Sequence, residues 1–359
     1  MRGLRTPAAV LAATGVLLAS GSGIAASTCK FGKLAEWTVR TGTSQVIVDG
    51  AINGKKIGIM LDTGAAYSIV LYSAVAELGL ALRPYGDIRL FGVGGETNVN
   101  AARIDEFRIG DTVRRDWLVV VGGEGDTFRG IGFILGSDFL GKVDVEFDLA
   151  HNAVRLFVPK DCDGAPLAYW ATSGVGVVEL DNSSSARSQT LLTVHVNGRP
   201  VLAQLDSGAA TTILTKIDAA RLGVTPETAG VVAVGVGGGL GPRTMQVWNG
   251  AFESFSIGNE TIRDTTIRFA DLWKDMTRTS AGGRTRQAVE VMPGMLLGAD
   301  FLRSHRVLIS NSQHRMYFTY AGGPVFSAPP TTGADSDDDD ETEPSRPDAT
   351  GHPGAPRQN

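Results

Sequence analysis

The chain carries two copies of one sequence pattern, and this duplication limits its possible folds more than any other feature. One copy holds Asn53-Gly54 followed by Leu61-Asp62-Thr63-Gly64-Ala65-Ala66, and the other holds Asn197-Gly198 followed by Leu205-Asp206-Ser207-Gly208-Ala209-Ala210. Both motifs are offset by 144 residues, as the step from Asp62 to Asp206 shows. Matched motifs in one order and at one spacing indicate two copies of a single structural unit. We therefore expect two similar lobes.

Three further pairs of segments extend the repeat, namely 76–80 with 220–224, 92–95 with 235–238, and 134–140 with 296–302. The first pair predicts a short helix ended by a glycine in the left-handed conformation. The second pair is rich in glycine, and the third begins with two apolar residues and a glycine. Because the third pair is offset by 162 residues, the second copy contains 18 extra residues. We place them within residues 271–292, as a surface loop.

The composition favours strands over helices. Of the 359 residues 46 are glycine and only 7% are aromatic, and short Val, Ile and Leu runs are interrupted by Gly, Asn and Asp. Such runs predict short strands, and Asn-Gly pairs are typical of tight hairpins. We expect an all-β fold with few short helices, in which residues 30–160 form the first lobe, 161–174 a linker and 175–322 the second lobe.

The N-terminal segment has the pattern of an export signal. Arg2 and Arg5 precede an apolar stretch and then a run of small residues, which predicts a signal peptide over residues 1–26. The apolar stretch is short for a membrane-spanning helix, so we do not expect a membrane anchor unless the signal stays uncleaved. The expected location is the periplasm or the extracellular space.

An acidic segment at the other end accounts for the net charge of −5. Residues 323–359 are rich in Pro, Gly, Thr and Asp, which predicts a disordered, solvated tail. Without this tail the chain has 31 basic and 30 acidic residues. A nearly neutral body gives no electrostatic indication of nucleic-acid binding.

The two cysteines, Cys29 and Cys162, lie on either side of the first copy of the repeat. In an exported protein they are candidates for a disulfide that ties the ends of the first lobe together. Two free thiols are the alternative. The five histidines are scattered and the cysteines are far apart, so we expect no metal site and no cofactor.

The Asp-Thr-Gly and Asp-Ser-Gly tripeptides are common turns by themselves, but their context here is specific. Each follows an apolar strand and precedes two small residues, a hydroxyl residue (Ser68 or Thr212), the glycine-rich stretch and the apolar pair with its glycine. In this combination the sequence resembles the retropepsins, the retroviral-type aspartic peptidases, over residues 40–158 and 185–320. The resemblance implies two β-barrel lobes related by a pseudo-two-fold axis, a monomeric pseudo-dimer and a protein or peptide substrate.

The resemblance also implies that Asp62 and Asp206 form a catalytic pair. Two carboxylates about 3 Å apart resist double ionisation, because their repulsion is roughly 5 kcal/mol at an effective dielectric constant of about 20. Such a pair shares one proton. Its ionised member can activate a water molecule while its protonated member polarises the substrate carbonyl, so peptide hydrolysis needs no covalent intermediate.

Supporting roles follow from the same resemblance. The hydroxyls of Thr63 and Ser207 are expected to lock the two loops together, and Gly64 and Gly208 to permit a tight backbone. The glycine-rich stretches resemble flaps that close over an extended substrate and bind its backbone. Plain glycine-rich turns are the alternative. The flap residues are Gly92, Val93, Gly94, Gly95, Gly235, Val236, Gly237 and Gly238.

Two pairs of residues modify this expectation. Ala65 and Ala209 stand where pepsin-like enzymes carry a hydroxyl that lowers the pKa of the pair, so we expect activity at mildly acidic to neutral pH. Asp138 and Asp300 also recur in the repeat. A position at a helix N-terminus is a sufficient structural reason for them, so we do not expect them to be catalytic.

The leading interpretation is an exported aspartic endopeptidase that cleaves extended protein segments. One alternative is a catalytically silent module that holds peptides in the same cleft. Another is an exported partner-docking protein that acts through its acidic tail. Retention of both aspartates and both following Thr/Ser-Gly pairs favours catalysis, since a binding protein needs neither.

Overall fold

The computed structural model describes residues 29–123, 128–181, 189–274 and 292–326. The predicted signal peptide, most of the acidic tail and most of the expected insertion at 271–292 lie outside these residues. None of the described helices is long and apolar enough to cross a membrane.

The first lobe is a closed barrel. The strands hydrogen-bond in the order β2-β3-β8-β4-β7-β6, the additional pairing of β2 with β6 closes the ring, and β5 extends from β6. Helix α1 (Tyr72–Leu78) follows β4 and ends at Gly79, which has φ 67°. The strands are β2 (Ile47–Ile52), β3 (Lys55–Leu61), β4 (Ile69–Leu71), β5 (Arg83–Gly92), β6 (Gly95–Ile109), β7 (Thr112–Gly122) and β8 (Phe133–Leu135).

The second lobe repeats this barrel strand for strand. The order is β12-β13-β18-β14-β17-β16, with β12 paired to β16 and β15 added at the edge. Helix α3 (Lys216–Arg221) occupies the place of α1. The strands are β12 (Leu191–Val196), β13 (Arg199–Leu205), β14 (Ile213–Thr215), β15 (Val232–Gly237), β16 (Met245–Ile257), β17 (Glu260–Ala270) and β18 (Met295–Leu297).

The tight hairpins predicted from the Asn-Gly pairs are present in both lobes. Asn53 and Gly54 have φ 49° and 78°, and Asn197 and Gly198 have φ 49° and 71°. Two consecutive left-handed residues are the geometry that Asn-Gly favours between antiparallel strands. Because these turns fix the register of β3 and β13, they also fix where each strand ends, one residue before its aspartate.

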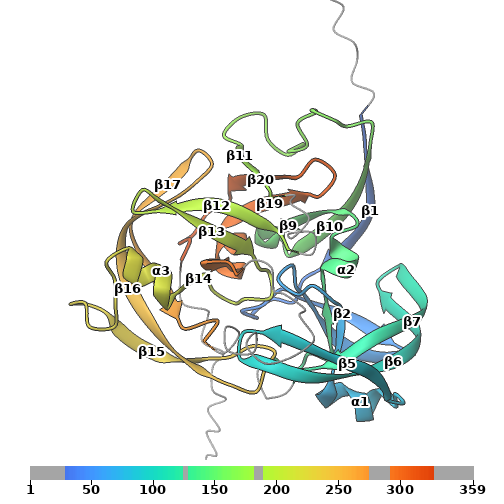
Figure 1. The fold of residues 1–359 in the computed structure, drawn as a ribbon. Coiled ribbons are helices and arrows are strands. Elements are labelled where there is room, and N and C mark those ends of the chain that lie inside the picture. Colours follow the sequence, from blue (N-terminus) through green and yellow to red (C-terminus); the bar gives the residue numbers. More distant parts are fainter. Residues whose placement is uncertain (1–28, 124–127, 182–188, 275–291, 327–359) are drawn as a thin grey trace, which may run out of the picture.

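A third sheet joins the lobes, and the division of the sequence into two lobes and a linker did not include it. Its order is β1-β10-β9-β19-β20-β11, so three strands of the first half lie beside three of the second and the halves meet where β9 pairs with β19. Figure 1 shows this sheet above and between the two barrels. The strands are β1 (Lys30–Thr38), β9 (Asp144–Asp148), β10 (Ala153–Lys160), β11 (Gly176–Glu179), β19 (His305–Ser310) and β20 (Arg315–Tyr320).

Short helices connect the barrels to this sheet. Helix α2 (Ser137–Leu140) leads from β8 to β9, and α4 (Ala299–Ser304) leads from β18 to β19. A 3-10 turn, η2 (Leu149–His151), joins β9 to β10. The prediction of an all-β fold with two similar barrels and few short helices is therefore confirmed.

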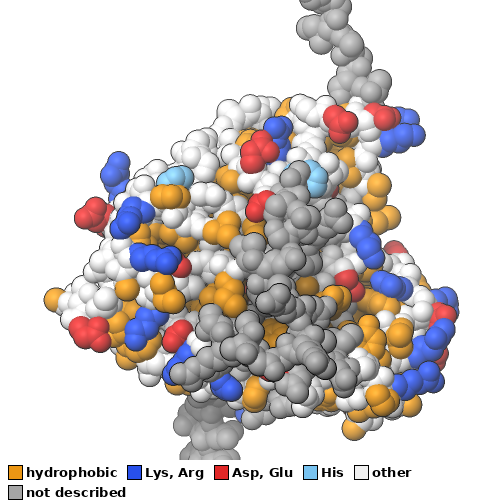
Figure 2. Space-filling view, viewed as in Figure 1, with side chains coloured by type: hydrophobic (Ala, Val, Ile, Leu, Met, Phe, Trp, Pro, Cys, Tyr) orange, Lys and Arg blue, Asp and Glu red, His pale blue; other side chains and the backbone are white. Residues whose placement is uncertain are grey.

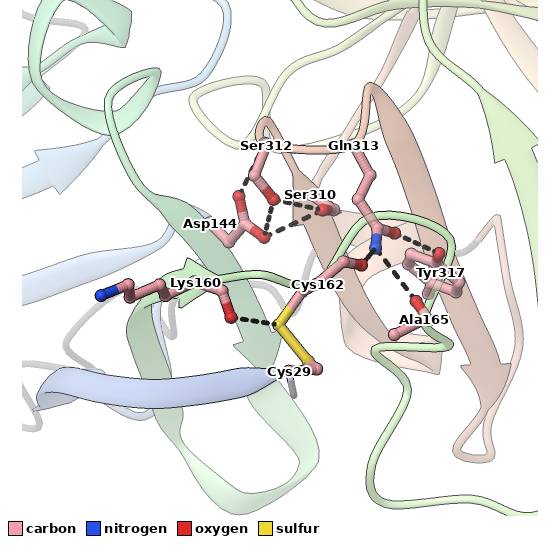
Figure 3. The surroundings of a disulfide bond; sticks show 9 residues. All are labelled: Cys29, Asp144, Lys160, Cys162, Ala165, Ser310, Ser312, Gln313 and Tyr317. Atoms are coloured by element: carbon pink, nitrogen blue, oxygen red, sulfur yellow. Dashed lines mark hydrogen bonds between the residues drawn. A yellow bond between two sulfur atoms is a disulfide. The ribbon is translucent and has the colours of Figure 1, made fainter. Parts of the chain in front are cut away.

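The expected pairing of the cysteines is present in the structure. Cys29 and Cys162 form a disulfide with an Sγ–Sγ distance of 2.08 Å across 133 residues of sequence (Figure 3). Residues 161–174 contain no regular strand, yet Cys162 and Leu167 are buried, so this predicted linker packs against the third sheet.

The described surface carries mixed charges. On the face shown in Figure 2, Lys and Arg side chains are interspersed with Asp and Glu. This agrees with the nearly equal counts of basic and acidic residues outside the tail.

Candidate active site

Each half of the site begins where a central barrel strand ends. Asp62 follows β3 and Asp206 follows β13, and their backbone N–H groups donate to Leu135 O and Leu297 O of the parallel strands β8 and β18. The apolar pair of the repeat therefore sits beside each aspartate as a buried strand and fixes the start of its loop.

The two loops bind each other through reciprocal hydrogen bonds. Thr63 Oγ1 donates to Leu205 O at 2.6 Å and accepts from Ser207 N at 3.1 Å. Ser207 Oγ donates to Leu61 O at 2.8 Å and accepts from Thr63 N at 3.0 Å. Both side chains are at most 2% exposed. The supporting role predicted for these hydroxyls matches this geometry.

This contact brings the two aspartates face to face. A methyl group at Gly64 would collide with the Asp206 carboxyl group, and one at Gly208 would collide with that of Asp62. Neither glycine has a positive φ. Glycine is needed here for close approach across the lobe interface, not for an unusual backbone angle.

Each carboxylate also accepts two backbone hydrogen bonds from its own loop. Asp62 Oδ1 accepts from Gly64 N and Ala65 N at 2.8 and 2.9 Å, and Asp206 Oδ1 accepts from Gly208 N and Ala209 N at 3.0 Å each. These bonds orient the carboxyl groups and favour their ionised forms.

Burial opposes that effect. It raises the pKa of Asp62 well above its ordinary value, and the facing charge of Asp206 raises it further. Burial also raises the pKa of Asp206. Because the charge of one ionised carboxyl disfavours ionisation of the other, this arrangement favours a pair that holds one proton.

The other repeated aspartates support the loops from behind. Asp138 Oδ1 accepts from Ser68 N and Ser68 Oγ at 2.8 and 2.6 Å. In the second lobe Asp300 accepts from Thr212 N and Thr212 Oγ1 in the same way. Burial raises the pKa of Asp300 to about 6. Neither residue lines the main cavity, in agreement with the structural role expected of them.

The first glycine-rich stretch forms the tip of a hairpin. Strand β5 ends at Gly92, Val93 and Gly94 make the turn, and β6 begins at Gly95. Gly94 and Gly95 have φ of 92° and 100°, which favour glycine. The hairpin predicted here is therefore present, and its residues Gly92 and Val93 line the cavity.

The second glycine-rich stretch differs from the prediction. Gly235, Val236 and Gly237 lie within β15, and only Gly238 belongs to the connecting loop, which runs from 238 to 244. Seven residues here replace the two of the first flap. The loop joining β17 to β18, residues 271–294, is 24 residues long, whereas 123–132 in the first lobe has ten. The extra residues of the second copy are thus divided between two loops and are not confined to 271–292.

The tips of the two flaps contact each other, and each tip packs against the opposite lobe. Gly241 N and Arg243 N donate to Val93 O and Gly94 O at 3.3 and 3.1 Å. Val93 packs against an apolar cluster of the second lobe, and Leu240 packs against one of the first. Each flap is therefore anchored on the opposite lobe, above the aspartates.

A cavity of about 720 Å³ lies between the aspartates and the flaps. Both aspartates line it, together with flap residues of both lobes. The rest of the lining is mostly apolar. Both lobes contribute apolar side chains to it, among them Met60, Ile69, Leu90, Val120, Ile134, Ile213, Met245, Val247, Leu272 and Leu296.

Two residues that the sequence reasoning missed tie the lobes together at this site. Gln204 Nε2 donates to Gly64 O at 3.1 Å, and Arg303 donates to Ser44 O and Ala210 O at 2.7 and 3.0 Å. Gln204 occupies the repeat position of Met60. A polar residue inside an otherwise apolar strand was the available signal. Arg303 gave none, because its partners are backbone atoms distant in sequence.

The described residues contain no group of three or more His, Cys, Asp or Glu side chains placed to hold a metal ion. The two aspartates are the acidic groups of the cavity lining.

The chain matches a known family model in both lobes. The family model described as aspartyl protease matches residues 48–139 and 192–301, one segment in each lobe and together more than half of the chain. Among solved structures, the crystal structure of an aspartic proteinase from Irpex lacteus is similar at 11% sequence identity and a TM-score of 0.47, covering 83% of this chain and 98% of that one. No curated protein sequence matches the chain.

Proposed function

Because this chain belongs to the aspartyl protease family, as a duplicated retropepsin-like member with two barrel lobes, we propose that it is an endopeptidase that hydrolyses peptide bonds between Asp62 and Asp206. The observation that carries the proposal is the pair of half-buried carboxyl groups held face to face by reciprocal hydrogen bonds between the Thr63 and Ser207 loops.

The proposed reaction uses the proton that the pair shares. The ionised carboxylate takes a proton from a water molecule, which attacks the carbonyl carbon of the scissile bond, while the protonated carboxyl donates to the carbonyl oxygen. As the tetrahedral intermediate collapses and the C–N bond breaks, the carboxyl that took the proton from water gives it to the departing amine, and the gem-diol returns its proton to the other carboxylate, which restores the singly protonated pair. Burial raises the pKa of both Asp62 and Asp206, which supports a pair that keeps one proton for this step.

The cavity supports an extended peptide as the substrate. The strands of both flaps border it, and their backbone groups can pair with a substrate strand. Its apolar walls favour hydrophobic side chains near the scissile bond. Because both half-sites come from one chain, we propose that a monomer is sufficient for activity.

We also propose that the protein acts outside the cytoplasm, in the periplasm or beyond. The pattern of residues 1–26 supports export. The disulfide between Cys29 and Cys162 supports the same location, since disulfides persist in oxidising compartments.

The test is incubation of the purified protein with a diverse peptide library, analysed by mass spectrometry. We expect cleavage by the wild type and a loss of at least a thousandfold in Asp62→Asn and in Asp206→Asn, since each removes one member of the acid–base pair. Asp264→Asn is the matched control, because Asp264 is an exposed aspartate of β17. Cleavage unaffected by either dyad substitution would refute the proposal, and peptide binding without cleavage would support the silent module instead.

A further inference from the structure

The two lobes differ in charge at one pair of equivalent positions in the cavity wall. Arg268 on β17 pairs with Ile213 of β14, and Val120 on β7 pairs with Ile69 of β4, so the two residues are repeat equivalents. Both line the cavity. Apart from the two aspartates, Arg268 is the charged residue among the described lining residues.

The residues near Arg268 are also more polar than those at the equivalent places near Val120. Arg268 Nη1 donates to Thr211 Oγ1 at 3.3 Å, whereas the repeat equivalent of Thr211 is Tyr67, which also lines the cavity. Across the strand, Arg268 faces Asn249 and Val120 faces Ala101. The first lobe thus serves as an internal reference, and against it the second lobe has a polar, cationic corner.

The hydrogen-bonding capacity of this corner is largely unused. A guanidinium group has five N–H donors, and the bond to Thr211 is the one that Arg268 makes among the described side chains. Asn249 Oδ1 is buried without a hydrogen-bond partner in the described part of the chain. A small polar cavity of about 40 Å³ adjoins both residues.

Among the described residues, the acidic one that borders the same small cavity forms no ion pair with Arg268. Asp300 borders the same small cavity, but its carboxylate accepts from Thr212 and from Phe301 N. No ion pair links Asp300 with Arg268, although both are described. A half-buried guanidinium without a carboxylate partner is suited to bind one from a ligand, because its planar fork matches the two carboxylate oxygens.

We propose that Arg268 and Thr211 form a subsite of the second lobe that selects an acidic side chain, Asp or Glu, in the substrate. This inference rests on the proposed peptidase function and specifies its substrate. The equivalent subsite of the first lobe, with Val120 and Tyr67, takes an apolar side chain. An acidic residue is therefore favoured on one side of the scissile bond only.

The experiment starts from a peptide that the enzyme cleaves in the library and that carries Glu at the position whose side chain enters the Arg268–Thr211 subsite. Its rate is compared with that of the same peptide with Gln at this position. For the wild type we expect the Glu peptide to have a kcat/KM at least tenfold higher, as a charge-assisted hydrogen bond provides. Arg268→Val, which copies the first lobe, should bring the ratio to about one. Arg268→Glu should reverse the preference and favour a Lys peptide. Arg263→Val, at an exposed arginine of β17 outside the cavity, should leave the ratio unchanged.

A binding measurement separates this inference from the peptidase function. Fluorescein-labelled forms of peptides with Glu or Gln at each position are titrated against Asp206→Asn and against Asp206→Asn/Arg268→Val, and the dissociation constants are read by anisotropy. Tighter binding of a Glu peptide that is lost in the double variant supports the subsite even if no cleavage occurs. Equal binding of Glu and Gln peptides, or a preference that survives Arg268→Val, overturns it even if cleavage depends on both aspartates.

Discussion

At the residue scale, the environment of the aspartate pair sets the pH range in which it can work. Ala65 N and Ala209 N donate to the aspartates, but the alanine side chains add no donor. Burial therefore dominates and holds the pKa of both carboxyls above the ordinary value. The singly protonated pair accordingly persists to higher pH than it would with an added hydroxyl donor.

The substitution Ala65→Ser tests this account. A hydroxyl that donates to the ionised Asp62 stabilises the charged form and lowers its pKa, so the alkaline limb of the kcat/KM profile should move down by about one pH unit. Ala65→Val controls for crowding, since it adds bulk without a donor. A wild-type profile that peaks only below about pH 3.5, or an alkaline limb that Ala65→Ser does not move, would contradict it.

At the scale of elements, the two flaps act as one covering structure because their tips are bonded to each other. Backbone hydrogen bonds from Gly241 and Arg243 to the first flap join the two hairpins. Val93 packs on the second lobe and Leu240 on the first, so each flap is anchored on the opposite lobe. A substrate that enters from above must separate these contacts first.

Gly94→Ala should loosen this cover. Its Cβ would meet Arg243 O and Gly241 O at 2.8 and 2.9 Å, and Gly94 has φ 92°. If the flaps bind substrate as proposed, a displaced flap weakens that binding, so we expect KM to rise about tenfold with a smaller change in kcat. Gly54→Ala is the control, because Gly54 also has a positive φ but open space around it. A KM equal to that of the wild type would show that the flap contact does not affect binding.

At the scale of the whole molecule, the third sheet holds the half-sites in register. Strand β9 of the first half pairs with β19 of the second. Arg306 of β19 donates a hydrogen bond of 2.9 Å to the buried Glu146 of β9. The disulfide end is also tied across the halves, because Gln313 Nε2 donates to Cys162 O and Ala165 O (Figure 3).

Removal of the disulfide should therefore weaken the whole fold. The variant Cys29→Ser/Cys162→Ser is expected to lose about 2–5 kcal/mol in the free energy of unfolding, since the bond closes a long loop in the unfolded chain. Urea denaturation measures the change. A reducing agent should destabilise the wild type to the same extent and leave the variant unaffected. Equal midpoints for oxidised wild type and variant would contradict this prediction.

The sequence by itself determined the features that depend on local chemistry and on the repeat. Strand periodicity, Asn-Gly turns and the repeat predicted a β-rich chain with two similar lobes, because both copies must build the same loop from the same few residues. The resemblance to retropepsins, carried by the paired Asp-Thr/Ser-Gly motifs, then implied the two barrels, the pairing of Asp62 with Asp206 and the supporting hydroxyls of Thr63 and Ser207.

Only the tertiary structure decided how the halves fit together. The third sheet pairs β9 with β19, which are distant in sequence. The residues of these strands do not indicate with which other strand each one pairs. The contacts between the flap tips and the bond from Gln204 to Gly64 likewise depend on which surfaces the two lobes bring into contact. Local propensity cannot specify such contacts, because their free energy arises from packing between segments far apart in the chain.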